Sequence, residues 1–345
     1  MKRRDEAEMR IAEIGEFGLI DRVAKGLPPL GQGVVVGIGD DAAVLRLSED
    51  RYLLTTCDIQ VEGVHFLRDK IAPQQLGRKA VAINLSDIAA MGGVPRYLTV
   101  SLTLPQETTV EYVDALYEGI RRECEACGVA VVGGNMAHSL AHIVIDTFLV
   151  GEVEPARLLL RSGACVGDRV LVTGSLGDSG AGLALLLNPG ITCAEEDRRR
   201  VLEAHLTPKA RLEEGRAIAL SGLATAMIDV SDGLASDVGH ICEQSKVGVR
   251  IWAERLPISS AAQAVAALVG RDPLEWALAG GEDYELLFTA PPKRVEALKI
   301  TVTETTGTPV TAIGEIVPAA SGRVLIQADG RTISLETAGW DHFKY

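Results

Sequence analysis

Carboxylates at turns are the residues of this 345-residue sequence best placed to do chemistry. They follow apolar, strand-like runs and stand at Asp40, Asp41, Asp58, Asp87, Asp229 and Asp232. Neighbouring carboxylates raise each other's pKa unless cations keep them ionised. Hard oxygen ligands suit Mg²⁺ or Mn²⁺ better than Zn²⁺ or copper. One such Asp alone is more often an Asx-turn or a helix N-cap, but the clusters together favour a metal site.

Two glycine-rich turns are the next candidates for a site. Gly37-Ile-Gly39-Asp-Asp-Ala42 has the GxGxxA spacing of a dinucleotide loop, yet two acids stand where a pyrophosphate would bind, which favours a metal-bearing turn. The turn at residues 174–182 either cradles an anion with backbone N–H groups or lets a small-residue helix pack closely. The sequence has no GxxxxGK[ST] motif, which excludes a P-loop NTPase, and it lacks the motif set of protein kinases, which excludes that class too.

Composition and charge exclude further classes. The chain has 34 Lys and Arg against 47 Asp and Glu, a formal charge of −13, which argues against binding by neutralisation of nucleic-acid phosphates. No apolar run approaches the ~20 residues that span a bilayer, and the N-terminus lacks a signal-peptide core. We therefore expect a cytoplasmic protein with neither a nucleic-acid nor a membrane partner. Cys124 and Cys127, a lone CxxC, are expected to be packed helix residues.

Strand-like and helical runs alternate along the chain, which predicts an α/β (α+β) protein. Strands are predicted at residues 33–36, 52–56, 97–104, 129–132, 143–153, 169–173, 248–253, 285–289, 310–316 and 324–328. A helix is predicted to start after Thr108 or Thr109 and to continue through Cys124 at 3.6-residue spacing. A domain boundary is predicted within residues 152–160, which separates residues 1–155 from residues 156–345.

Longer blocks around these residues resemble the thiamine-monophosphate kinase family. Three blocks are in the first half: Gly-Ile-Gly-Asp-Asp-Ala-Ala-Val from Gly37, Gly-Val-His-Phe from Gly63, and residues 79–92, which include Asn-Leu-Ser-Asp-Ile-Ala-Ala-Met-Gly from Asn84. Three more are in the second half: Ile-Asp-Val-Ser-Asp-Gly-Leu from Ile228, Gly-Gly-Glu-Asp-Tyr-Glu-Leu from Gly280, and the terminal Gly-Trp-Asp-His-Phe from Gly339. The acidic turns are shared with aminoimidazole ribonucleotide synthetase, selenophosphate synthetase and the hydrogenase-maturation dehydratase. The block from Asn84, the block from Gly280 and the terminal block narrow the resemblance to the kinase.

The resemblance implies a fold and an activity. The fold is the two-domain aminoimidazole ribonucleotide synthetase-like fold. Its N-terminal domain, residues 1–155, would bind ATP and Mg²⁺ and form a homodimer through its sheet, and a larger α/β domain, residues 156–345, would complete the active site. The activity is in-line transfer of the γ-phosphoryl group of ATP to thiamine monophosphate, the last step of thiamine diphosphate biosynthesis, assisted by several Mg²⁺ ions. No general base is expected, because a phosphate oxygen is already a nucleophile.

The resemblance also implies a role for individual residues. Mg²⁺ would be held by Asp41, Thr56, Cys57, Asp58, Asp87, Asn135, Asp229 and Asp232, with Asp40 as a helper. ATP would contact Tyr117, Gly134, Asn135, Arg161 and Ser231, and thiamine monophosphate would contact His65, Glu282 and Trp340.

Two of these positions depart from the family pattern. Cys57 replaces the usual Thr, so that only its backbone carbonyl is a good Mg²⁺ ligand, and Asn135 replaces the usual Asp and loses a charge. We expect weaker binding at one Mg²⁺ site with activity retained. Two alternatives stay open: a related ATP-using synthetase that acts on a purine intermediate or selenide, and a non-catalytic nucleotide-binding relative.

Overall fold

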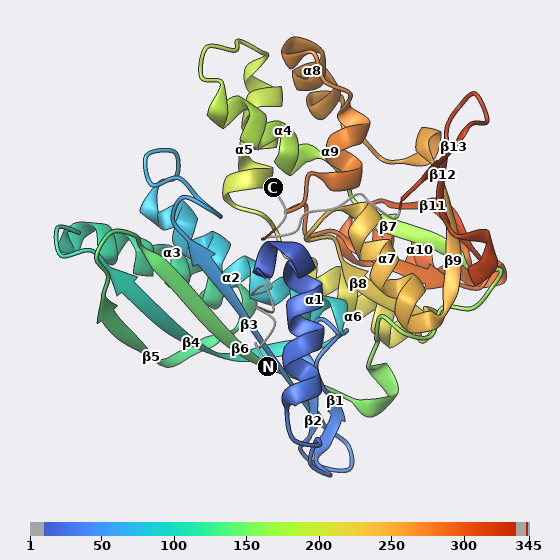
Figure 1. Ribbon diagram of the computed structural model, residues 1–345, viewed down its shortest axis with the longest axis horizontal. Helices are drawn as coiled ribbons and strands as arrows, with labels where there is room; N and C mark the ends of the chain where they lie inside the picture. The colour runs from blue at the N-terminus through green and yellow to red at the C-terminus, as the bar shows by residue number, and fades with distance from the viewer. Residues whose placement is uncertain (1–9, 336–342, 344–345) are drawn as a thin grey trace, which may run out of the picture.

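The computed structural model describes residues 10–335 and residue 343, and it contains two sheets on opposite sides of the molecule (Figure 1). The first sheet has the strand order β1-β2-β3-β6-β4-β5. Its strands are β1 (Val34–Val36), β2 (Ala43–Arg46), β3 (Tyr52–Val61), β4 (Val94–Leu104), β5 (Ala130–His138) and β6 (Val144–Val153). Only β4 and β5 pair in parallel, and the other neighbours are antiparallel.

Two helices, α2 (Pro73–Ala90) and α3 (Val110–Cys127), cover the buried face of this sheet. Thr109 caps α3, because its side chain accepts a hydrogen bond from the backbone N–H of Tyr112, so the predicted helix start is confirmed. Cys124 is buried and Cys127 half-buried on this helix, and burial raises the pKa of the Cys124 thiol to about 12. Both cysteines are packing residues, as predicted.

The second sheet has the order β13-β12-β9-β11-β7-β10-β8. Its strands are β7 (Arg169–Thr173), β8 (Ala226–Asp229), β9 (Val247–Trp252), β10 (Leu286–Ala290), β11 (Val310–Pro318), β12 (Arg323–Ile326) and β13 (Thr332–Ser334). One face packs against α7 (Leu234–Ser245), and the other packs against α6 (Leu212–Ser221) and α10 (Val295–Thr306). The α/β (α+β) prediction is confirmed. The strands β2, β8 and β13 were not predicted, since each has at most four residues and β8 is buried on both faces without alternation.

A further group of helices extends from the second sheet, at the top of Figure 1. It contains α4 (Asp178–Leu187), α5 (Glu195–Leu206), α8 (Ser260–Val269) and α9 (Pro273–Ala279), which share a small core around Trp276. The short 3₁₀ helices are η1 (Pro155–Arg157), η2 (Ala253–Arg255), η3 (Pro292–Arg294) and η4 (Ala319–Ser321).

The helix α2 joins the two halves of the molecule. Its middle packs on the first sheet through residues such as Leu85 and Ile88, and its last turn packs on the second sheet through Ala89 and Ala90. It crosses α3 at Gly77, where an added Cβ would lie 2.1 Å from the carbonyl oxygen of Leu116. A polar residue on the last turns of α2 can therefore reach strands of both sheets.

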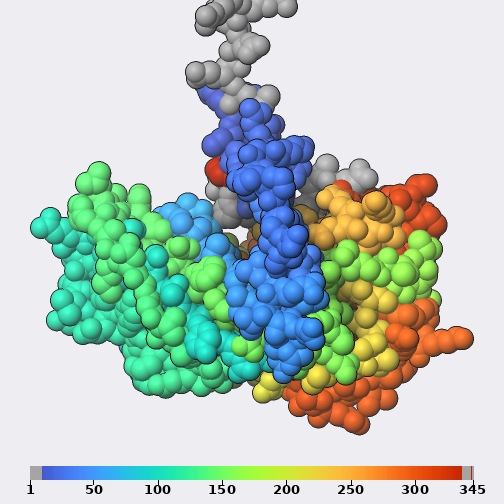
Figure 2. Space-filling model, turned by 90° about the horizontal axis from the view of Figure 1, so that it is seen from below, coloured from blue at the N-terminus to red at the C-terminus, as the bar shows by residue number. Residues whose placement is uncertain are grey.

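The first helix, α1 (Ile11–Gly26), lies over the junction between the two halves (Figure 2). It is kinked at Gly15, which has a φ of 70°. Within residues 10–335, no helix combines the length and the apolar character that crossing a bilayer requires.

Candidate active site

The helix α2 carries three polar side chains that connect the sheets. Asn84 donates a hydrogen bond to the Thr147 hydroxyl on β6 at 2.8 Å. Ser86 donates one to Asp229 at the end of β8 at 2.6 Å, and Asp87 accepts one from Thr56 on β3. The Asn-Leu-Ser-Asp sequence therefore fixes the relative position of the two sheets at one point.

A cluster of three carboxylates forms at that point. Asp41, Asp87 and Asp229 each place an oxygen within 4.8 Å of the others, although they come from the turn before β2, from α2 and from β8. Asp58 on β3 adds its charge to that of Asp87. Among the described residues, the Oδ2 atom of Asp41 has no hydrogen-bond partner although it is buried. Such a buried oxygen is costly unless a cation binds it.

Burial controls the electrostatics of this cluster. It raises the pKa of Asp229 to about 8 and that of Asp58 to about 6, and it raises the pKa of Asp87 well above its ordinary value. The charges of Asp58, Asp229 and Asp41 raise the pKa of Asp87 further. Arg161 balances part of this charge, since its Nη2 lies 2.5 Å from Asp41 Oδ1. The carboxylates outnumber this cation, so the donor set suits divalent metal ions with oxygen ligands.

Asp40, next to this cluster, accepts a hydrogen bond from the backbone N–H of Arg161, 3.2 Å from Oδ2. Burial, followed by the charge of Asp41, raises the pKa of Asp40 to about 6.

We expect the metal-free protein to lose stability between about pH 4 and pH 8 as the pH rises. The folded-state pKa values of Asp58 (about 6) and Asp229 (about 8) lie above the ordinary 3.8, so the folded protein retains protons that the unfolded chain releases. Their contribution is complete below the unfolded pKa and is lost as the pH passes the folded pKa. Thermal unfolding in EDTA across this range should show a falling Tm, and Mg²⁺ should restore it at high pH.

The matched control for this pH dependence is Asp229→Asn, which removes the carboxyl group whose pKa burial raises to about 8. Its Tm should fall less than that of the wild type between about pH 6 and pH 8. A wild-type Tm in EDTA that stays level or rises over that interval, or an equal fall in the variant, would contradict the account of the cluster.

A pocket of about 890 Å³ opens beside the cluster. It brings together six of the predicted site residues: Cys57, Asp58, His65, Ser231, Asp232 and Glu282. Lys79, His205 and Tyr284 also line it, and the sequence had given none of them a role. Because β3 and α2 form one wall and the turn before α7 forms another, both halves of the chain contribute to this pocket.

The loop at residues 280–285 is held against the turn that precedes α7. The backbone N–H of Glu282 donates to the Ser231 carbonyl at 2.7 Å, and that of Tyr284 donates to the Val230 carbonyl at 2.8 Å. Glu282 and Tyr284 have positive φ values of 57° and 49°, which are uncommon for residues other than glycine. Backbone strain of this kind is typical of functional sites.

The side chain of Glu282 contacts the cation Lys79 and the imidazole of His205, both on the opposite wall. Lys79 Nζ lies 2.7 Å from Oε1, and the Lys79 side chain is only 1% exposed. His205 Nδ1 lies 3.3 Å from Oε2. Burial alone would raise the pKa of Glu282, but the charge of Lys79 outweighs it and the pKa is lowered. Burial lowers the pKa of His205 to about 4, so its imidazole is neutral at neutral pH. Glu282 therefore presents a negative charge to the pocket at neutral pH.

The backbone N–H groups of the glycine-rich turn before α4 bind a side chain of the protein itself. The backbone N–H groups of Gly177 and Ser179 donate to the two oxygens of Asp283, at 2.7 and 3.2 Å. A Cβ at Gly180 would lie 2.9 Å from the Trp276 ring, so this glycine also allows close packing. The carboxyl group bound at this helix N-terminus thus belongs to the same loop that carries Glu282.

Three predicted ATP contacts lie away from the carboxylate cluster within the chain. Gly134 and Asn135 are on β5, and the order β3-β6-β4-β5 puts that strand three positions, roughly 14 Å, from β3. Across the sheet, Asn135 is in register with Ser101, Asp146 and Ile59, so the side chains of these residues share one face. Asp58 is the neighbour of Ile59 in β3 and faces the other way. Asn135 therefore lies on the outer face of the sheet, opposite to Asp58. The alternation along β3 puts the Cys57 side chain on that outer face too, although the residue also lines the pocket.

Tyr117 is the third of these contacts and lies on α3, half-buried against the core of the first sheet. Trp340 lies outside the described residues.

Comparison with known proteins identifies the family. Residues 39–153 match the family model described as AIR synthase related protein, N-terminal domain, and residues 166–327 match that of the C-terminal domain. The thiamine-monophosphate kinase of Aquifex aeolicus is 41% identical over 335 residues, which cover 97% of this chain and 100% of the relative. The chain belongs to the thiamine-monophosphate kinase family. The thiamine-monophosphate kinase of Escherichia coli K12 is 39% identical, and the match covers 95% of this chain and 98% of the relative. That of Bacillus subtilis is 37% identical, and the match covers 90% of this chain and 94% of the relative.

Solved structures support the same family and the predicted fold. The structure of AaThiL complexed with AMPPCP and TMP superposes with a TM-score of 0.84 at 39% identity, covering 98% of this chain and 100% of that chain. Hydrogenase maturation protein HypE in complex with ATP has a TM-score of 0.69 at 22% identity, covering 86% and 87%, and so shares the fold. The predicted aminoimidazole ribonucleotide synthetase-like fold is thus confirmed for this member of the thiamine-monophosphate kinase family.

Proposed function

We propose that this protein transfers the γ-phosphoryl group of ATP to the phosphate of thiamine monophosphate, producing thiamine diphosphate and ADP. The observation that carries the proposal is the buried cluster of Asp41, Asp87 and Asp229 next to a pocket that ends at the charged Glu282. Relatives of this chain named thiamine-monophosphate kinase match over nearly its whole length, and one related structure holds an ATP analogue together with TMP.

Magnesium fits the residues of the cluster. The carboxylates are hard oxygen donors, and the unpartnered Oδ2 of Asp41 is a buried acceptor that a cation would satisfy. We propose that Asp41, Thr56, Asp58, Asp87 and Asp229 hold Mg²⁺, with Asp232 and the Cys57 carbonyl as further ligands at the pocket. Mg²⁺ held there would neutralise the phosphate oxygens of both substrates, which otherwise repel each other.

The chain's own residues then bind and orient the two substrates. Arg161 and Ser231 flank the cluster and are proposed to contact ATP. Glu282 offers its negative charge to the cationic thiazolium ring, and His65 lines the same pocket. Because an in-line attack by a phosphate oxygen needs alignment more than proton transfer, no side chain is assigned as a general base.

A homodimer is proposed to form through the outer face of the first sheet. That face exposes Ile59, Tyr97 and Phe148, whose exposed fractions are 50%, 50% and 41%. The edge strand β5 is unpaired on one side within the described residues and exposes Met136. Asn135 lies on this face, away from the carboxylate cluster of its own chain. In a dimer it could instead lie beside the carboxylate cluster of the partner chain.

We propose a cytoplasmic location. All six cysteines of the sequence lie within residues 10–335, and each of them is a free thiol in the structure. Free thiols are typical of a reducing compartment.

Product analysis tests the proposed reaction. The purified protein is incubated with ATP, Mg²⁺ and thiamine monophosphate, and thiamine diphosphate is measured by its fluorescence after oxidation to the thiochrome derivative. We expect equal amounts of thiamine diphosphate and ADP. Turnover of ATP only with a purine intermediate or selenide would favour a related synthetase, and nucleotide binding without any product would favour a non-catalytic relative.

We expect Asn135→Asp to lower the Mg²⁺ concentration that gives half-maximal activity, because the added carboxylate restores a charged oxygen ligand. Activity at saturating Mg²⁺ should change by less than about 3-fold, since the buried carboxylates remain. The measurement is the initial rate as a function of free Mg²⁺. If wild type and variant saturate at the same concentration, Asn135 does not weaken a metal site.

A further inference from the structure

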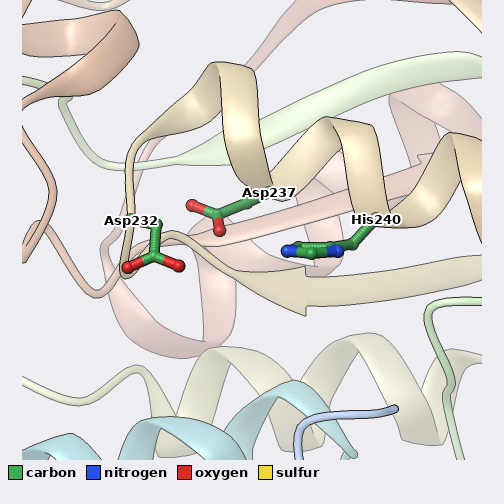
Figure 3. Close-up of side chains that lie close together, drawn as sticks. All are labelled: Asp232, Asp237 and His240. Atoms are coloured by element: carbon green, nitrogen blue, oxygen red, sulfur yellow. The ribbon is translucent and has the colours of Figure 1, made fainter. Parts of the chain in front are cut away.

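A second group of possible metal ligands lies at the start of α7. Asp232, Asp237 and His240 each offer one ligand atom, and these atoms lie within 4.8 Å of one another (Figure 3). Asp232 is in the turn before the helix, Asp237 is in its first turn, and His240 follows three residues later on the same face. Figure 3 shows the three side chains directed to one side of α7.

Asp237 is the residue that requires explanation. It is 1% exposed, and among the described residues its Oδ2 atom has no hydrogen-bond partner. A buried carboxylate with an unsatisfied oxygen is strongly unfavourable unless a cation lies beside it. Asp237 is inside the first turn and the cap position is Gly233, so helix capping does not explain the buried oxygen, and the side chain points to a ligand.

The neighbouring cations are engaged elsewhere. Arg161 is held by Asp41 at 2.5 Å, and Arg323 is held by Glu243 at 2.9 Å. On the side of α1, the ring of Phe17 packs against the ring of His240 with 4.8 Å between their centroids. The imidazole is therefore fixed by an apolar neighbour, and the charge of Asp237 lacks a dedicated ion pair among the described residues.

We propose that Asp232, Asp237 and His240 bind one divalent ion of the Mn²⁺ or Zn²⁺ type. Two carboxylates and one imidazole favour such ions, whereas Mg²⁺ prefers oxygen ligands alone. Bonds of about 2.1 Å would bring the donors roughly 3 to 4 Å apart, so small side-chain rotations close the site. This site differs in ligand type from the all-oxygen cluster of Asp41, Asp87 and Asp229.

The inference rests on the proposed function in one respect, since Asp232 is also in the proposed Mg²⁺ set. Otherwise the site stands on its own geometry. Asp232 lines the substrate pocket, so an ion bound here lies at the edge of that pocket and adds positive charge where phosphate groups are proposed to bind.

Electron paramagnetic resonance of Mn²⁺ tests the site in the full-length protein. Chelator-treated protein is supplied with a large excess of Mg²⁺ and about one equivalent of Mn²⁺, so that Mg²⁺ fills the all-oxygen sites. We expect one Mn²⁺ per chain to stay bound and to show ¹⁴N coupling from an imidazole. Labelling the histidines with ¹⁵N should convert this coupling to that of ¹⁵N, a test that needs no variant.

Two variants assign the nitrogen to its residue. His240→Asn should abolish the coupling and weaken Mn²⁺ binding at least 10-fold, whereas His205→Asn, which alters another histidine at the pocket, should leave both unchanged. Loss of Mn²⁺ to excess Mg²⁺, bound Mn²⁺ without ¹⁴N coupling, or coupling that survives in His240→Asn would each overturn the proposal. None of these outcomes bears on thiamine diphosphate formation with Mg²⁺ alone, so the two proposals fail separately.

Discussion

Replacement of Asp87 by Asn is expected to lower kcat for thiamine diphosphate formation by about 10³-fold or more while it stabilises the metal-free protein. Asp87 is the carboxylate that all other members of the cluster surround: Thr56 donates to it, and Asp58, Asp229 and Asp41 raise its pKa. The amide keeps the shape of the side chain but cannot offer a charged oxygen to Mg²⁺. The measurements are kcat at saturating Mg²⁺ and thermal unfolding in EDTA.

The gain in stability follows from the raised pKa of Asp87. Burial favours its neutral form in the folded state, and the unfolded chain releases the proton at neutral pH, so the carboxylate costs stability there. Asn is neutral in both states and avoids this cost. Asp114→Asn, at an exposed position of α3, is the matched control and should change neither quantity. An active Asp87→Asn protein, or a less stable one in EDTA, would mean that the cluster is structural.

Replacement of Lys79 by Met should lower kcat/KM for thiamine monophosphate by about 10²-fold and leave KM for ATP nearly unchanged. Lys79 is 1% exposed and holds the Glu282 carboxylate at 2.7 Å, so its loss leaves a charge at the pocket wall without its closest cation. We expect Glu282 to take up a proton and to lose its attraction for the thiazolium ring. Breaking such a pair by removing one partner costs about 3–5 kcal/mol of stability.

The double variant Lys79→Met/Glu282→Gln separates stability from function. It removes both charges of the pair, so it should regain most of the lost stability, because no uncompensated ion remains. It should not regain kcat/KM, since the carboxylate itself is absent. Steady-state kinetics with each substrate and chemical unfolding of the four proteins of the cycle provide the measurement. Recovery of both quantities, or of neither, would contradict the assigned role of Glu282.

Local sequence patterns predicted the features that depend on short stretches of chain. The start of α3 followed from Thr109 and the spacing of apolar residues after it, and the helix cysteines followed from their position in that pattern. The Asp-rich turns indicated a metal site, and the structure brings Asp41, Asp87 and Asp229 together. That Asp40 and Asp41 share Arg161 could not be predicted, because Arg161 is about 120 residues away in the chain.

Features that depend on the order of strands in the sheet could not be predicted from the sequence. Gly134 and Asn135 come directly after the strand predicted at residues 129–132, where a turn at the site was expected. In the structure they are part of β5, and β6 and β4 lie between β5 and β3. Lys79 looks like an ordinary helix lysine, since its burial depends on the loop of Glu282 from the other half of the chain. Its only signal was that it opens the block from residue 79 that resembles the family.

Transfer of isotope from ATP tests the central claim most directly. The protein is supplied with Mg²⁺, thiamine monophosphate and ATP that carries ¹⁸O in its γ-phosphoryl group, and the product is examined by ³¹P nuclear magnetic resonance. We predict that the terminal phosphoryl group of thiamine diphosphate carries the ¹⁸O and that the phosphate joined to thiamine does not. Label that appears only in inorganic phosphate, with thiamine monophosphate unchanged, would contradict the proposed phosphoryl transfer.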